Sequence, residues 1–127
     1  MADDTIPICL RDFIGSNIQS VEQLEILCLL AEDRSRAWSI TNVCRCIQST
    51  EKSVREGLQY FVGQGLLAAD AQGLFRFSPA TPELNASVMK LIKCYRERRV
   101  AIIEAIYKKP IESVQHLADV LRIRKDQ

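Results

Sequence analysis

Apolar residues recur at helical spacing in several separate stretches of this chain, and polar or glycine-containing segments divide them. The clearest stretch follows Ser20, where apolar side chains three and four positions apart predict a helix buried on most sides. Its stripe consists of Val21, Leu24, Leu27, Cys28 and Ala31. Gln23 follows Ser20 at the spacing of a capping box, which marks a helix start. A shorter apolar face over residues 6–14 predicts a first helix that ends at Gly15.

Two further helices are predicted on either side of a polar turn. Ser39 and Thr50 are residue types that favour the N-cap position, so we expect helices over residues 39–47 and 50–62. The inner face of the second helix is formed by Val54, Leu58, Phe61 and Val62. The pattern then becomes strand-like. Residues 66–78, with Gly73 near the middle, predict a β-hairpin.

The last third of the chain begins with a clear helix start. Thr81-Pro82-Glu83 combines a cap, a proline at the first helical position and an acid in the first turn. The apolar stripe that follows, interrupted at Arg98, predicts one helix that continues to about Lys108. A helix of about 26 residues is ~39 Å long. Pro110 then interrupts the chain, and a last helix is predicted around Val114, Leu117, Ala118 and Leu121.

The stretch from Trp38 to Leu67 resembles, without a gap, the winged helix-turn-helix of bacterial transcriptional regulators. The residues that carry the resemblance are the capping Ser39 and Thr50, the small Cys44 at the helix crossing, the apolar Val54, Leu58 and Phe61, and the Gly65-Leu66-Leu67 step into the hairpin. The resemblance implies a mainly α fold with a small β-hairpin wing and flanking N- and C-terminal helices. We therefore expect an N-terminal helical extension over residues 1–19, the winged helix-turn-helix over 20–78, and C-terminal helices over 79–127.

The flanking helices make the chain loosely similar to MarR-like regulators, in which the terminal helices of two subunits interlock as a dimer. That family usually has more residues and a longer basic wing. A helix of ~39 Å extends beyond a core this small, so its apolar face predicts a homodimer interface. The predicted dimerisation residues are Leu84, Val88, Leu91, Tyr95, Ile102 and Ile106. In the competing arrangement, the chain folds back at Pro110 and buries this face within one subunit.

The resemblance implies a transcriptional regulator that binds double-stranded DNA. The start of a recognition helix should offer polar groups to base edges, with cations nearby for the phosphates. The predicted DNA-binding residues are Ser49, Thr50, Lys52, Ser53, Arg55, Gln59 and Arg76. However, Glu51 and Glu56 balance the two cations of the helix, and the hairpin tip has no basic residue. An alternative therefore stays open: a non-enzymatic protein–protein interaction module on a winged-helix scaffold that no longer binds DNA.

Charge and composition add further constraints. Residues 1–33 carry one basic and seven acidic residues. Residues 34–78 carry six basic and three acidic residues, and residues 79–127 carry ten basic and six acidic residues. This distribution permits residues 34–127, where basic residues are in excess, to bind a nucleic acid.

Five cysteines without a C-x-x-C pair favour reduced thiols over disulfides or a zinc site. No catalytic motif is present, so we expect no enzyme, cofactor or metal. The acidic N-terminus and the lack of a long apolar run predict a cytoplasmic protein without membrane contact.

Overall fold

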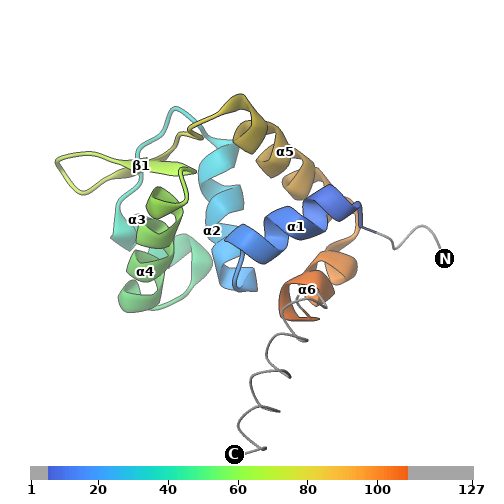
Figure 1. Ribbon diagram of the computed structural model, residues 1–127. Coiled ribbons are helices and arrows are strands. Elements are labelled where there is room, and N and C mark those ends of the chain that lie inside the picture. The colour runs from blue at the N-terminus through green and yellow to red at the C-terminus, as the bar shows by residue number, and fades with distance from the viewer. Residues whose placement is uncertain (1–5, 109–127) are drawn as a thin grey trace, which may run out of the picture.

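The computed structural model describes residues 6–108, which form six helices and one two-stranded antiparallel sheet. In chain order the elements are α1 (Ile8–Asn17), α2 (Val21–Glu32), α3 (Ile40–Ile47), α4 (Glu51–Gly63), β1 (Leu67–Ala69), β2 (Phe75–Phe77), α5 (Pro82–Glu97) and α6 (Arg99–Lys108). Helix α2 lies between α3, α4 and the hairpin on one side and α5 and α6 on the other (Figure 1). The order of helices and strands agrees with the order predicted from the sequence through the hairpin.

Four helices begin at a hydroxyl side chain, as predicted. Ser20, Ser39, Thr50 and Thr81 each accept a hydrogen bond from the backbone N–H three residues later, at 3.1 to 3.2 Å. These bonds satisfy backbone donors that the first helical turn leaves without a partner. The capping box at Ser20 differs in one detail: the side chain of Gln23 accepts from the backbone of Gln19, at 2.8 Å.

Strand β2 pairs with β1 on one edge and with a distant segment of the chain on the other. Strands β1 and β2 pair in antiparallel register, with Leu67 opposite Phe77 and Ala69 opposite Phe75. On its other edge, Phe75 exchanges two backbone hydrogen bonds with Trp38, of 2.7 and 2.8 Å. This bridge ties the segment before α3 to the hairpin and places both on one small sheet.

A single apolar cluster holds all six helices and the hairpin together. Leu24, Leu27 and Leu30 of α2 are fully buried, and Leu58 and Phe61 of α4 pack into the same cluster. The cluster also includes residues from α1, the hairpin, α5 and α6. Residues 20–78 therefore share one core with the flanking helices.

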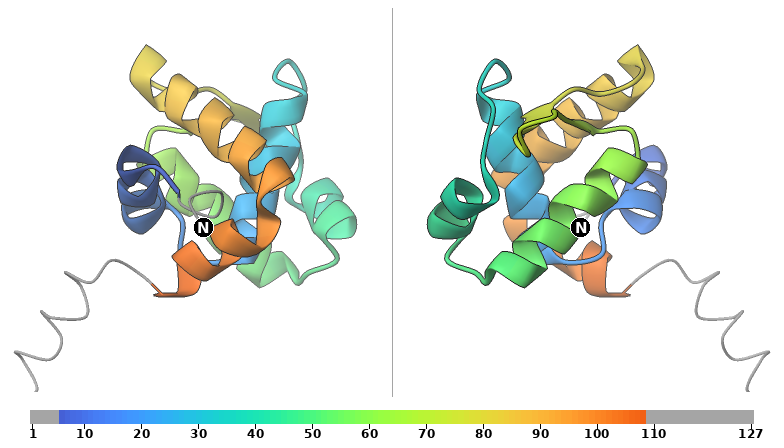
Figure 2. Two further views of the ribbon diagram at one scale, coloured as in Figure 1. Left: turned by 90° about the vertical axis from the view of Figure 1, so that its right-hand side faces the viewer. Right: turned by 90° about the vertical axis from the view of Figure 1, so that its left-hand side faces the viewer.

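The prediction of one long helix over residues 81–108 is wrong. Helix α5 ends at Glu97, and Arg98 adopts a non-helical backbone with φ −138° and ψ 60°. The chain turns there, so that α6 runs in a different direction from α5 (Figures 1 and 2). This turn brings Ile102 and Ile106 back onto the shared core, where both are fully buried. Burial of these side chains is the physical reason that a broken helix is favoured over a straight one.

The first helix is longer than the sequence predicts. Gly15 does not end the first helix; α1 continues through Asn17, whose side chain donates to the carbonyl of Phe13 at 3.1 Å. The helix predicted after Pro110 lies outside the described residues. Within residues 6–108, no helix combines the length and the apolar character needed to cross a membrane.

Candidate nucleic-acid interface

The predicted recognition helix is α4, and a tight turn fixes its start against α3. Gln48 ends α3 in the left-handed region, with φ 62° and ψ 53°, and Ser49 and Thr50 lead directly into α4. The thiol of Cys44 donates to the carbonyl of Ser49, which anchors the turn to α3. Cys44 is also partly buried against the apolar core.

The far end of α4 is held by α1. The carbonyl of Ser16 accepts from the hydroxyl of Tyr60 at 3.3 Å and from the amide nitrogen of Gln64 at 3.1 Å. The same amide nitrogen donates to Oδ1 of Asn17 at 2.8 Å. Both ends of α4 are therefore fixed by side-chain bonds, and its outward face has a defined orientation.

Three of the predicted DNA-binding residues lie on that outward face. Lys52, Arg55 and Gln59 are exposed, whereas the inner positions Val54 and Leu58 are fully buried. Within residues 6–108, neither Lys52 nor Arg55 makes a salt bridge. The two cations are thus available to a ligand, although Glu51 and Glu56 are exposed on the same helix.

The three predicted hydroxyl residues at the start of α4 are engaged inside the protein. Thr50 uses its hydroxyl oxygen to cap the helix. Ser49 donates to Oε1 of Glu22 at 2.7 Å, and Ser53 donates to Oε2 of the same carboxylate at 2.5 Å. Sequence reasoning missed Glu22, because it precedes these serines by 27 and 31 positions and no local pattern links them.

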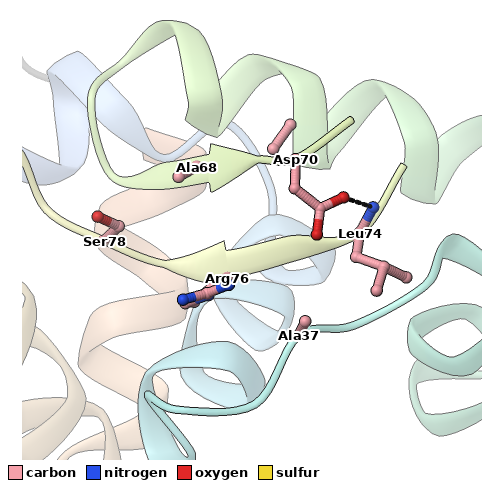
Figure 3. Close-up of a pocket in the computed structure, with 7 residues that line it drawn as sticks. Ala37, Ala68, Asp70, Leu74, Arg76 and Ser78 are labelled. Carbon is pink, nitrogen blue, oxygen red and sulfur yellow. Dashed lines mark hydrogen bonds between the residues drawn. The ribbon is translucent and has the colours of Figure 1, made fainter. Parts of the chain in front are cut away.

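Arg76 lies on the exposed face of β2, in a shallow hollow (Figure 3). Small side chains surround it there, including Ala37, Ala68 and Ser78. Asp70 at the edge of the hollow accepts from the backbone N–H of Leu74 at 3.0 Å, so its carboxylate serves the hairpin turn. Among residues 6–108, Arg76 is the only cation that lines the hollow, and its side chain is exposed.

Two further arginines border the hairpin and are fixed by aromatic rings. The guanidinium of Arg36 lies 3.6 Å from the centre of the Trp38 ring and stays exposed. Arg34 lies 5.0 Å from the centre of the Phe77 ring and donates to Oδ1 of Asn85 at 2.7 Å. Stacking on an aromatic face holds a cation in place without neutralising it. Arg36 therefore adds positive charge beside the hairpin.

The thiols and carboxylates of the described residues form no further site of evident chemistry. No group of three His, Cys, Asp or Glu side chains within residues 6–108 is arranged to hold a metal ion. Burial, with a smaller contribution from Glu32, raises the pKa of the Cys28 thiol to about 11. At neutral pH this thiol is protonated and therefore a poor nucleophile.

Comparisons with known proteins bear on the fold. No protein-family model matches the chain, and no curated protein matches its sequence. Among solved structures, it is similar to the crystal structure of MepR, a transcription regulator of the Staphylococcus aureus multidrug efflux pump MepA. The TM-score is 0.50 at 15% sequence identity, over 92% of this chain and 89% of that chain.

The chain has a winged-helix fold. The predicted fold class, mainly α with a small β-hairpin wing and flanking helices, is thereby confirmed. In this fold α3 and α4 are the helix-turn-helix, and β1 and β2 are the wing. The wing is short, with strands of three residues each, and its tip at residues 71–73 carries no cation.

Proposed function

We propose that this protein is a DNA-binding transcriptional regulator that acts as a homodimer through its winged helix-turn-helix. The observation that carries the proposal is the outward face of α4, which presents Lys52 and Arg55 on a winged-helix scaffold. Neither cation has a carboxylate partner among residues 6–108. The proposed DNA-contacting residues are those two cations with Gln59, the start of α4 at Ser49, Thr50 and Ser53, and Arg76 of the wing.

The distribution of ion pairs supports this choice of face. Arg96 pairs with Glu32 at 2.9 Å, and Arg99 lies 3.6 Å from Glu25. Both pairs link α2 to the chain around the α5–α6 turn, away from the helix-turn-helix. Cations that already face carboxylates contribute less to phosphate binding, because the partner must first be displaced. The unpaired cations of α4 are better suited to that role.

A mobility-shift experiment tests DNA binding. The purified protein and a duplex of about 30 base pairs, together with the region upstream of its own gene, are mixed at low salt and then at rising salt. We expect retardation at low salt that weakens steeply as salt increases, because phosphate contacts release counterions. No retardation at low salt by a folded protein contradicts the proposal. Recovery of a stoichiometric protein partner without nucleic acid then favours the interaction-module alternative.

The proposed dimer needs a surface other than the one predicted from the sequence. Val88, Leu91, Tyr95, Ile102 and Ile106 are at most 7% exposed within a single chain, and Leu84 is half-buried. These side chains belong to the core of their own subunit, so the argument from an uncovered apolar face no longer applies to them. The large apolar residues that do remain exposed among residues 6–108 are Ile8, Val100 and Tyr107. They lie on α1 and α6, which favours these two helices as the contact between subunits.

Light scattering at micromolar concentration tests the dimer. We expect a mass near twice 14.4 kDa for the unmodified chain. Aspartate at both Val100 and Tyr107 should lower the mass to that of one chain, because charge at an apolar contact is costly to bury. Aspartate at the exposed Lys93 of α5 is the control and should leave the mass unchanged. A mass near 14.4 kDa for the unmodified chain contradicts the dimer.

A further inference from the structure

The carboxylate of Glu22 joins two elements that the chain separates widely. Glu22 lies in the first turn of α2, whereas Ser49 lies in the turn before α4 and Ser53 in its first helical turn. Oε1 of Glu22 accepts a hydrogen bond from Ser49 at 2.7 Å, and Oε2 accepts one from Ser53 at 2.5 Å. All three residues are half-buried. The bracket formed by Glu22, Ser49 and Ser53 therefore fixes the start of the recognition helix to α2.

This arrangement determines which hydrogen bonds the two serines can still make. A hydroxyl has one proton and two acceptor lone pairs, and an ionised carboxylate can only accept. Because each serine directs its proton to Glu22, each oxygen keeps only acceptor capacity toward a ligand. Phosphate oxygens are acceptors too, so Ser49 and Ser53 cannot bind them while the bracket is intact. The same holds for O6 and N7 of guanine and for O4 of thymine.

The major-groove groups that remain are the amino groups of adenine and cytosine, which are the donors at the base edges. The start of a recognition helix is the part that meets base edges in helix-turn-helix proteins. We propose that Glu22 is a positioning residue that holds Ser49 and Ser53 as acceptors, so that the start of α4 selects adenine or cytosine. The inference rests on the proposed function, since it specifies which bases that DNA interface favours.

Selection of binding sites from a random DNA pool tests the base preference. Glu22→Gln keeps the shape of the side chain but replaces one acceptor oxygen with an amide that donates. That amide then donates to one serine, whose own proton becomes free for guanine, thymine or phosphate. We expect the preference for adenine or cytosine at the positions facing the start of α4 to fall about tenfold. Glu83→Gln changes the net charge equally at an exposed site on α5 and should keep the preference of the unmodified protein.

A merely structural role for Glu22 gives a different result. In that case Glu22→Gln weakens binding to all sequences equally and leaves the selected bases unchanged, which overturns the proposal. Ser49→Ala with Ser53→Ala provides a second check, because Glu22→Gln should not alter base selection further in that background. An additional shift there also contradicts the acceptor role.

Hydrogen exchange in the free protein separates this inference from the proposed function. Exchange of the backbone amides at residues 49–53 should become about tenfold faster in Glu22→Gln and stay unchanged in Glu83→Gln. Unchanged exchange in Glu22→Gln overturns the positioning role, whatever DNA binding shows. Faster exchange in a protein that binds no DNA refutes the proposed function and the base preference, and leaves Glu22 as an anchor of α4 only.

Discussion

Replacing Ile102 with aspartate is expected to unfold this protein rather than to release a folded monomer. Ile102 is fully buried in α6, among side chains of its own chain. Truncation of such a residue to alanine typically costs about 2–5 kcal/mol. Aspartate adds the cost of an unpaired buried charge, which exceeds the margin of stability of many small domains.

Urea unfolding followed by circular dichroism measures this effect. Lys93→Asp is the matched control, because it places aspartate at an exposed position on the neighbouring helix α5, outside the proposed contact between subunits. That variant should stay folded, with a change in unfolding free energy within about 0.5 kcal/mol. If Ile102→Asp instead stays folded and has the mass of one chain while the unmodified protein has the mass of two, the result supports the dimer interface predicted from the sequence.

Replacing Arg55 with alanine has the largest expected effect on DNA binding by a single cation. Its side chain is exposed on the outward face of α4 and makes no salt bridge with the described part of the chain, so its removal should leave the stability almost unchanged. If Arg55 reads a base, the free energy of binding to the selected sequence should become less favourable by about 1–3 kcal/mol, and the sequence preference should relax.

Competition binding against the selected and a scrambled duplex measures this change. Arg96→Ala, which removes an exposed cation that pairs with Glu32, is the control for net charge and should reduce affinity much less. An equal loss on both duplexes assigns Arg55 to a phosphate contact. Full retention of affinity on both removes Arg55 from the interface.

Much of the fold was predictable because the signals are local. Thr50 caps a helix through a bond to the backbone three residues later, so its role follows from the sequence around it. The same reasoning located the starts at Ser20, Ser39 and Thr81. The hairpin was visible from the turn at Gly73, whose φ of 81° favours glycine. Apolar spacing likewise identified the buried face of α4.

The candidate site was predictable only in part. Which residues of α4 face outward follows from helical period, so Lys52, Arg55 and Gln59 were placed correctly on the exposed face. Their role in binding DNA stays a prediction. That Ser49 and Ser53 donate to a carboxylate was not predictable, since hydrogen bonds between separate helices depend on how those helices pack.

The sequence by itself determined the kinds of element, the helix starts and the pattern of inner and outer faces, since these depend on residues within a few positions of each other. The tertiary structure alone decided that the chain turns at Arg98, because only the packing of α6 against α1 and the shared core shows where Ile102 and Ile106 are buried. It likewise decided that Glu22 meets the start of α4. Both outcomes depend on contacts between distant segments, which form only when the whole core is assembled.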